Sequence, residues 1–356
     1  MRVIELGDRD CGLDAVVVID HELFPVGVGG TRMLPDVDRR EVARLARAMT
    51  WKFAVYRVPY AGAKAGIRFA GGDRPAVLAA YKRALEPYAG IFLTGPDMGT
   101  FPADFLDGTE DPLPLWARSH EGLGMDDLAT GHGVKAAAEA ALAQLGRGLA
   151  GATVALEGFG KVGAGTARAC ARAGARIVGV STVDGLLADQ DGLDVEELLA
   201  LRALHGDRFV EHGPRQVRPR EALFELECDV LVPGARPDSI TSTVADRVRC
   251  AVVAPGANIP YGPGAVEVLR ERGILAVPDF VSNSGANHLY DTVSQEEPAA
   301  ALAAIEAVVR KAAARVLSTA EELGITPYTA ALRDARDFLA RSTRAPGEAL
   351  DALVPG

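Results

Sequence analysis

Lysine is rare in this chain of 356 residues, so each lysine is a candidate for specific chemistry. Only six lysines occur, and all other basic residues are arginines. Arginine thus supplies most of the positive charge, whereas a lysine ammonium can change its protonation state when buried. Lys64 is flanked by Gly62, Ala63, Ala65 and Gly66. Neighbours this small permit a desolvated position beside another cation, which lowers the pKa of a lysine and suits it to acid–base catalysis.

A second motif spaces three glycines as G-x-G-x-x-G between an expected strand and an expected helix. Gly158 permits a tight turn, Gly160 lets the backbone approach a pyrophosphate, and Gly163 allows close packing of helix on strand. Amide groups at the start of the helix can bind the phosphates. The other members of the turn are Phe159, Lys161 and Val162. This context favours a dinucleotide-binding turn over a merely structural one.

The end of the following strand leaves the choice between NAD and NADP open. An acidic residue is expected there to accept hydrogen bonds from the adenosine ribose. The chain instead has Ser181 and Thr182, and Asp184 comes two residues too late. An acid at this point repels a 2′-phosphate, so its absence permits either cofactor.

Strands and helices alternate regularly after Gly131, and this pattern predicts a parallel sheet covered on both faces. The expected strands are Ala152–Leu156, Arg176–Val180, Asp229–Val232, Ala251–Ala254 and Leu275–Val277, and the expected helices are Gly133–Leu145, Val162–Ala173, Pro298–Leu323 and Pro327–Arg341. Earlier in the chain we expect a strand at Leu13–Asp20, a helix at Arg40–Arg57, a strand at Ile91–Thr94 and an exposed loop at Asp107–Glu121. The helix at Arg40–Arg57 carries apolar residues at helical spacing.

Composition excludes several classes of protein. Hydrophobic residues make up 48% and charged residues 24%, so a wholly disordered chain is excluded. The net charge of −10 argues against a partner such as nucleic acid or an anionic membrane surface. The four cysteines are scattered without metal-ligand spacing, so we expect reduced thiols and no metal site. With no apolar signal segment and no apolar stretch long enough to span a membrane, we expect a cytoplasmic protein.

Five segments occur in an order that resembles the Glu/Leu/Phe/Val amino-acid dehydrogenase family, closer to its leucine, valine and phenylalanine branch than to glutamate dehydrogenase. Besides the glycine turn, the segments are Gly29-Gly-Thr-Arg-Met33, Met49-Thr-Trp-Lys52 with Tyr60-Ala-Gly-Ala-Lys-Ala-Gly66, Gly95-Pro-Asp-Met-Gly99, and Pro278-Asp-Phe-Val-Ser-Asn-Ser-Gly285. The resemblance implies an α/β fold with two domains around a cleft. Residues 1–128 plus 326–356 would form the substrate-binding and oligomerisation domain, and residues 129–325 a Rossmann-type domain. It also implies a homo-oligomer.

The implied reaction is reversible NAD(P)-dependent oxidative deamination of an L-amino acid to a 2-oxo acid and ammonia. The resemblance assigns Lys52 to the substrate carboxylate, Lys64 to acid–base catalysis and Asp97 to proton exchange with the amino group. The other positions that match the substrate site are Val28, Gly29, Gly30, Met49, Gly95, Asn287 and Tyr290. Those that match the cofactor and nicotinamide site are Thr130, Ala235, Asn258 and Asn283, beside Ser181 and Thr182.

The side chain of the substrate is expected to be neutral. Glutamate-specific relatives have a lysine where this chain has Val28 and a serine where it has Tyr290. Burial of a second carboxylate without a cation costs several kcal/mol. Asn287 and His288 suggest a larger or partly polar side chain, unless they point away from the substrate. Two alternatives stay open: a glutamate dehydrogenase with an unusual side-chain clamp, and a catalytically silent cofactor-binding regulator.

Overall fold

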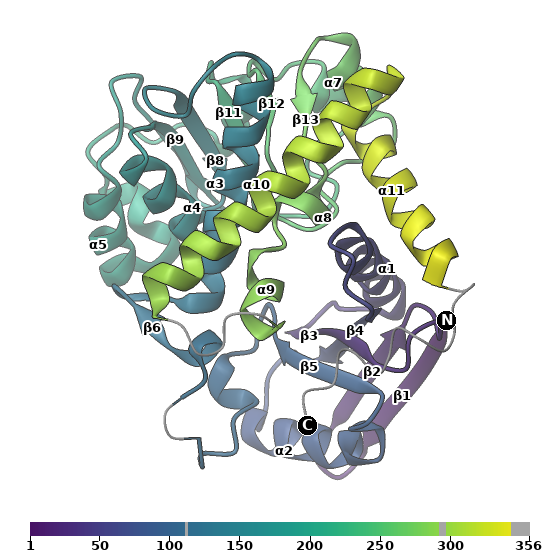
Figure 1. Cartoon of the computed structure of the whole chain (residues 1–356). Coiled ribbons are helices and arrows are strands. Elements are labelled where there is room, and N and C mark those ends of the chain that lie inside the picture. The colour runs from purple at the N-terminus through teal and green to yellow at the C-terminus, as the bar shows by residue number, and fades with distance from the viewer. Residues whose placement is uncertain (111–112, 292–296, 343–356) are drawn as a thin grey trace. The chain divides into compact units, whose positions relative to one another are not determined.

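Two separate β-sheets, one of five strands and one of six, form the framework of the chain (Figure 1). The computed structural model describes residues 1–110, 113–291 and 297–342. The chain divides into two compact units: unit 1 comprises Met1–Glu110 and Leu332–Gly356, and unit 2 comprises Asp111–Ala331. Both domain boundaries expected from the sequence, after residues 128 and 325, fall inside unit 2.

The sheet of unit 1 has the strand order β1-β2-β4-β3-β5. Its strands are β1 (Arg2–Asp8), β2 (Leu13–Ile19), β3 (Gly27–Leu34), β4 (Ala61–Arg68) and β5 (Phe92–Pro96). β4 pairs antiparallel with β2 and parallel with β3, and β3 pairs parallel with β5. β2 and β5 lie close to the expected positions. β1, β3 and β4 were not expected as strands, and β3 and β4 carry two of the sequence motifs.

Helices cover both faces of this sheet. α2 (Arg74–Leu85) packs its Val77, Leu78 and Tyr81 on one face, against core residues such as Val17 and Ile67. α1 (Arg39–Val55) covers the other face, where its Val42 and Ala46 meet Val18. The Asp38 side chain caps α1 by accepting a hydrogen bond from the Glu41 backbone N–H at 2.7 Å. The last helix, α11 (Pro327–Ser342), begins in unit 2 and continues into unit 1.

The sheet of unit 2 confirms the expected parallel arrangement. Its order is β10-β9-β8-β11-β12-β13. The strands are β8 (Thr153–Glu157), β9 (Arg176–Thr182), β10 (Gly185–Ala188), β11 (Val230–Pro233), β12 (Val252–Val253) and β13 (Leu275–Ala276). All neighbours pair parallel except β10, which is antiparallel to β9. The chain adds β9 and β10 on one side of β8 and later adds β11, β12 and β13 on the other side of β8. The strand order therefore reverses at β8.

Helices pack around this second sheet. They are α3 (Met125–Gln144), α4 (Lys161–Arg172), α5 (Val195–His205), α6 (Ser242–Ala245), α7 (Ala265–Glu271), α8 (Asp279–Ser282), α9 (Gly285–Asp291) and α10 (Pro298–Leu323). α3 packs against both α4 and α10 (Figure 1). α3 begins eight residues before the helix expected at Gly133–Leu145. The expected loop at 107–121 includes a 3₁₀ turn at Leu115–Ala117 and strand β6 (Ser119–His120). β6 pairs with β7 (Leu123–Gly124).

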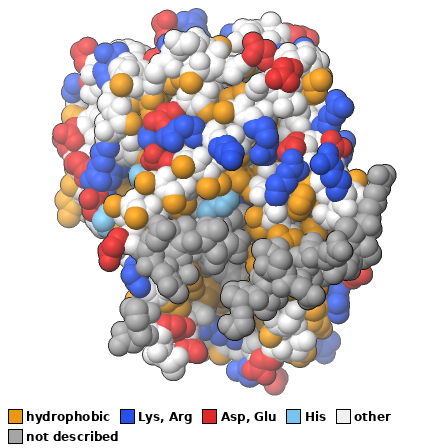
Figure 2. All heavy atoms as spheres, viewed as in Figure 1, with side chains coloured by type: hydrophobic (Ala, Val, Ile, Leu, Met, Phe, Trp, Pro, Cys, Tyr) orange, Lys and Arg blue, Asp and Glu red, His pale blue; other side chains and the backbone are white. Residues whose placement is uncertain are grey.

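Acidic and basic side chains are intermingled on the face drawn in Figure 2. All four cysteines are free thiols, of which Cys170 and Cys228 are buried. Among the described residues, no helix combines the length and the apolar character needed to cross a bilayer.

Candidate functional site

Lys64 lies in the middle of the sheet of unit 1 rather than in a loop. It is a residue of β4, which β2 and β3 flank, and its side chain is only 6% exposed. Successive side chains of a strand point to opposite faces, so Lys64 shares a face with Gly62 and Gly66. A Cβ on Gly62 would lie 2.1 Å from the Thr50 backbone nitrogen of α1. The small neighbours of Lys64 therefore let α1 cover β4 closely and bury the lysine.

Asp97 follows the end of β5 and reaches the same lysine. The Lys64 Nζ donates to Asp97 Oδ2 at 2.8 Å. The turn is fixed by Thr100, whose Oγ1 accepts from the Asp97 backbone N–H at 2.9 Å and donates to Thr31 O at 2.8 Å. Gly99 adopts a φ of +78° and passes close to Met33 O. The structure thus brings together the two residues that the sequence assigned to proton transfer.

Gly30 leaves room for this pair. It lies opposite Gly95 in the parallel pairing of β3 with β5. A Cβ on Gly30 would lie 2.8 Å from Pro96 O, 3.1 Å from Asp97 Cβ and 3.4 Å from Lys64 Nζ. A larger residue here would displace the carboxylate from the ammonium group.

Arg32 stands in a quoted motif, but no role was assigned to it from the sequence. Its Nε donates to Asp97 Oδ2 at 3.0 Å, and a second guanidinium nitrogen pairs with Glu41. The Arg32 side chain is 5% exposed. Only the three-dimensional contacts reveal that this arginine is buried between two carboxylates.

Burial and charge change the pKa values of this group in different directions. Burial lowers the pKa of Lys64, and the nearby Arg32 lowers it further, against the opposing effects of Asp97 and Glu41. Burial by itself raises the pKa of Asp97, but the charges and hydrogen bonds of Lys64 and Arg32 outweigh it and hold that pKa well below its ordinary value. The site therefore pairs a firmly ionised carboxylate with a lysine that loses its proton more readily than a free one.

Other residues of the expected substrate site lie on the same elements. Lys52 and Met49 are on α1 and are 6% and 9% exposed. α1 is held to the end of β2 by Asp20, whose carboxylate accepts from the Thr50 hydroxyl at 2.7 Å. Val28 and Gly29 are on β3 and Gly95 is on β5, and Val28 is half-buried.

In unit 2, the glycine turn has the geometry that a pyrophosphate needs. Gly158 has a φ of +88°, and a Cβ on Gly163 would lie 2.1 Å from Gly158 O. Gly160 precedes the first residue of α4, no side chain caps that helix end, and a Cβ on Gly160 would meet nothing within 4 Å. The open space and the uncapped N-terminus of α4 fit a dinucleotide. Both lie at the carboxyl end of β8, where the strand order reverses.

The turns after β11 and β12 adjoin this glycine turn. A Cβ on Gly158 would lie 3.4 Å from Ala235 Cβ, and one on Gly256 would lie 3.2 Å from Val162 Cγ1. The Asn283 amide donates to Ala257 O at 2.9 Å and to Asn258 Oδ1 at 3.1 Å. Ala235, Asn258 and Asn283 therefore gather at the same edge of the sheet.

The end of β9 carries the two hydroxyl residues expected near the adenosine ribose. Ser181 and Thr182 are 3% and 8% exposed. The Thr182 hydroxyl accepts from the Asp184 backbone N–H at 3.1 Å, and Asp184 is itself exposed.

Thr130 lies on α3 and is 7% exposed. Its hydroxyl donates to Asp126 O at 3.0 Å. α9 begins directly against this segment, since a Cβ on Gly285 would lie 1.8 Å from Ala129 O. Asn287 is in α9 and is half-buried. Tyr290 also falls in α9, but its side chain lies outside the described part of the structure.

Two further groups of ionisable residues occur on α3. His132 lies within α3, and its Nδ1 is 2.6 Å from Glu306 Oε1 of α10. Lys135 Nζ donates to Glu306 Oε2 at 2.9 Å. Burial by itself raises the pKa of Glu306, but His132 and Lys135 together lower it to about 2. In the first turn, burial and the neighbouring Asp126 raise the pKa of Asp127 to about 7.

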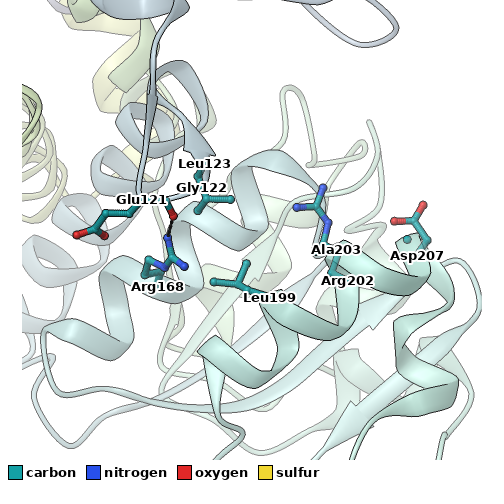
Figure 3. A pocket seen from close by; sticks show the side chains of 9 residues that line it. Glu121, Gly122, Leu123, Arg168, Leu199, Arg202, Ala203 and Asp207 are labelled. Carbon is teal, nitrogen blue, oxygen red and sulfur yellow. Dashed lines mark hydrogen bonds between the residues drawn. The ribbon is translucent and has the colours of Figure 1, made fainter.

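A cavity of about 620 Å³ opens elsewhere on unit 2, between α4, α5 and the segment at 121–123 (Figure 3). Arg168 donates from its guanidinium to Glu121 O at 2.7 Å at its edge. None of the residues expected to bind substrate or cofactor lines this cavity. In the described part of the chain, no three His, Cys, Asp or Glu side chains are grouped so that they could hold a metal ion.

Comparison with known families identifies the chain. Residues 122–347 match the family described as Glutamate/Leucine/Phenylalanine/Valine dehydrogenase, and residues 7–105 match the Glu/Leu/Phe/Val dehydrogenase dimerisation domain. The chain belongs to this family. The dimerisation-domain match contains Lys52, Lys64 and Asp97, and the larger match contains the glycine turn.

Individual relatives within the Glu/Leu/Phe/Val dehydrogenase family are described as glutamate dehydrogenases. The chain is 32% identical over 275 residues to an NADP-specific glutamate dehydrogenase of Saccharolobus shibatae, covering 72% of this chain and 65% of the relative. It is 34% identical over 278 residues to a glutamate dehydrogenase of Thermotoga maritima, covering 72% of this chain and 66% of the relative. The matches thus span slightly less than two thirds of these relatives.

A solved structure confirms the family fold over nearly the whole chain. The hetero-hexameric glutamate dehydrogenase from Thermus thermophilus, in its leucine-bound form, is similar with a TM-score of 0.83 and 28% identity. The similarity covers 97% of this chain and 89% of the other. The two-domain α/β architecture expected from the sequence is therefore confirmed.

Proposed function

We propose that this member of the Glu/Leu/Phe/Val dehydrogenase family catalyses reversible NAD(P)-dependent oxidative deamination of a neutral L-amino acid. The observation that carries the proposal is the buried contact of 2.8 Å between Lys64 Nζ and Asp97 Oδ2. A lysine with a lowered pKa beside an ionised carboxylate is an acid–base pair, and the family membership supports its use on an amino acid.

The reaction is balanced by one dinucleotide and one water. The amino acid, the oxidised dinucleotide and water yield the 2-oxo acid, ammonium, the reduced dinucleotide and one proton. A bound dinucleotide supplies the nicotinamide ring that accepts hydride from Cα. In the reverse direction the same groups serve reductive amination, because each proton donor becomes the acceptor.

The chain's own residues account for binding and proton transfer. Lys52 is proposed to bind the substrate carboxylate, and its position on the buried side of α1 supports this role. Asp97 is proposed to exchange a proton with the substrate amino group and to hold that proton only transiently, because its pKa lies well below the ordinary value. Neutral Lys64 takes a proton from the water that attacks the imine carbon, and returns it when ammonia leaves. The first step needs Lys64 in the neutral state that burial favours, and the second step uses the ammonium group that the first one forms.

The glycine turn of unit 2 is proposed to bind the dinucleotide. The Gly158–Gly163 turn and the amide groups at the start of α4 would hold the pyrophosphate, with Ala235, Asn258 and Asn283 lining the groove. Thr130 is proposed to lie near the nicotinamide. Ser181 and Thr182 carry no charge at the end of β9, so we leave both NAD and NADP as cofactors of the proposal.

The substrate side chain is proposed to be neutral because Val28 offers no cation to a second carboxylate. Gly95 provides space beside it, and Asn287 and Tyr290 are proposed as further contacts. Glutamate is the second candidate. The specific observation in its favour is that both sequence relatives described above are glutamate dehydrogenases.

The assembly is proposed to be a homo-oligomer formed through unit 1. The dimerisation-domain match over residues 7–105 supports an interface in this unit. The Thermus thermophilus relative is described as hetero-hexameric, so a second type of subunit is the alternative.

The test is a spectrophotometric assay of dinucleotide reduction with NAD and with NADP, across a panel of L-amino acids that includes glutamate. We expect turnover with leucine, valine, phenylalanine or tryptophan. Lys64→Ala should abolish turnover and retain dinucleotide binding, whereas Lys311→Ala, which removes an exposed lysine of α10, should leave both unchanged. Turnover with glutamate alone would refute the neutral side chain, and unaltered turnover in Lys64→Ala would refute the acid–base role.

A further inference from the structure

Arg32 binds the same carboxylate oxygen as the acid–base lysine. Asp97 Oδ2 lies 2.8 Å from Lys64 Nζ and 3.0 Å from Arg32 Nε. The side chains of Lys64 and Arg32 are 6% and 5% exposed, and that of Asp97 is 16% exposed. Two cations therefore converge on one shielded oxygen, where interactions between charges are stronger than at the surface.

The position of Arg32 is fixed from a second side. Its other end pairs with Glu41, in the first turn of α1, and the Glu41 backbone is held by the Asp38 cap. On the sheet, Arg32 lies opposite Gly66 in the parallel pairing of β3 with β4. A planar guanidinium held at both ends has little freedom to rotate, so it can orient the carboxylate that it contacts.

The charged groups that act on Lys64 come from three elements. Asp97 follows β5, Arg32 is on β3 and Glu41 is on α1. Burial lowers the pKa of Lys64 most, the charge of Arg32 lowers it further, and Asp97 and Glu41 raise it. Arg32 is thus a cation that acts on the lysine as well as on the carboxylate.

We propose that Arg32 is a positioning residue of the reaction, which orients the Asp97 carboxylate and promotes release of the Lys64 proton through its own positive charge. The role rests on the deamination proposed above. It differs from a purely structural ion pair because it makes the protonation of Lys64 depend on a side chain that does not itself exchange protons.

Three variants separate charge from geometry. Arg32→Gln removes the cation, Arg32→Lys keeps a positive charge with a different shape, and Glu41→Gln removes the carboxylate that opposes Arg32. The measurement is kcat and kcat/KM for amino-acid oxidation across pH, where activity rises as Lys64 loses its proton.

For Arg32→Gln, we expect the rising limb of the pH–activity profile to move to higher pH by about one unit, because one positive charge beside Lys64 is lost. In Glu41→Gln the limb should move to lower pH by a smaller amount. Arg32→Lys should keep the limb near its wild-type position, with a reduced kcat because the carboxylate is oriented less well. A loss of activity in Arg32→Gln with an unmoved limb would overturn the proposal, as would equal displacement in Arg32→Lys and Arg32→Gln.

A readout that needs no turnover distinguishes this proposal from the proposed function. The rate at which acetic anhydride acetylates Lys64, measured by mass spectrometry across pH, reports its protonation because only the neutral amine is nucleophilic, with exposed Lys311 as the internal reference. We expect labelling to shift in Arg32→Gln and Glu41→Gln in the same directions as the kinetic limb. If the wild type oxidises no amino acid and labelling still shifts, the proposed function fails and the effect of Arg32 on Lys64 stands. If turnover occurs and labelling does not shift, the role of Arg32 is refuted alone.

Discussion

Gly30→Ala is the sharpest test of the close packing around the acid–base pair. The added Cβ would lie 2.8 Å from Pro96 O, and ordinary contact begins near 3.4 Å. Relief of that contact requires a displacement of about 0.6 Å. Asp97 follows Pro96 directly and shares the strain, since its Cβ would be only 3.1 Å from the new methyl group. The contacts of Asp97 with Lys64 and Arg32 must therefore lengthen.

The expected decrease in kcat follows from this displacement. A misplacement of about 1 Å in a catalytic group can cost about 100-fold in rate, so we expect kcat to fall by at least about 10-fold in Gly30→Ala. Overpacking should also lower the free energy of unfolding by about 1–3 kcal/mol. Steady-state kinetics on the preferred amino acid and urea unfolding measure the two effects.

Gly90→Ala is the matched control in the same unit. No atom lies within 4 Å of a Cβ at Gly90, and its φ is not positive. We expect kcat and stability close to wild type in this variant. If Gly30→Ala is folded and turns over at the wild-type rate, the close contact does not position Asp97, and the reasoning fails.

Two other predictions concern unit 2. Gly163→Ala should weaken dinucleotide binding by at least about 10-fold, measured by calorimetric titration, because its Cβ would lie 2.1 Å from Gly158 O and distort the turn. Glu306→Gln should lower the free energy of unfolding at neutral pH by about 1–3 kcal/mol, because it removes a charge-assisted contact with Lys135. Since the pKa of Glu306 is lowered to about 2 in the fold, its contribution is complete above its unfolded pKa of 4.5 and is lost as pH falls toward 2.

Each of these predictions has a control or a contrary result. Gly148→Ala adds a methyl group with no atom within 4 Å and should leave dinucleotide binding unchanged. Equal binding by wild type and Gly163→Ala would refute the packing argument. For Glu306→Gln, the difference from wild type in urea unfolding should narrow between neutral pH and pH 3, and a difference that stays constant would show that Glu306 acts by packing alone.

Much of the fold of unit 2 was predictable from local sequence. Its glycines stand at a fixed spacing, and β8, β9 and β11 are continuous apolar runs of the kind that a buried parallel sheet requires. α3 was only partly foreseen because Gly131 and Gly133 resemble a helix boundary. In the structure these glycines instead permit close packing, since a Cβ on Gly131 would lie 2.4 Å from Thr166 N and one on Gly133 3.0 Å from Ser282 O.

Unit 1 was harder to predict because its strands have poor local signals. β4 reads Ala-Gly-Ala-Lys-Ala-Gly-Ile-Arg and β3 contains two adjacent glycines, so β-propensity does not indicate a strand in either. Contact with α1 and with neighbouring strands decides the conformation. The resemblance to a family supplied the roles of Lys64 and Asp97, whereas the contact of Arg32 with Asp97 joins residues 65 positions apart and could not be read from spacing.

The division of the chain into two units has an evolutionary consequence. Lys64, Asp97, Arg32 and Glu41 all belong to unit 1, whereas the glycine turn and the end of β9 belong to unit 2. If the roles proposed above hold, mutations that alter which pyridine nucleotide is preferred lie in a different compact unit from the ionisable groups of the proposed proton transfer. Under the same proposal, selection, or directed evolution in the laboratory, could adjust nucleotide preference in unit 2 and the pH range of activity in unit 1 by separate sets of mutations.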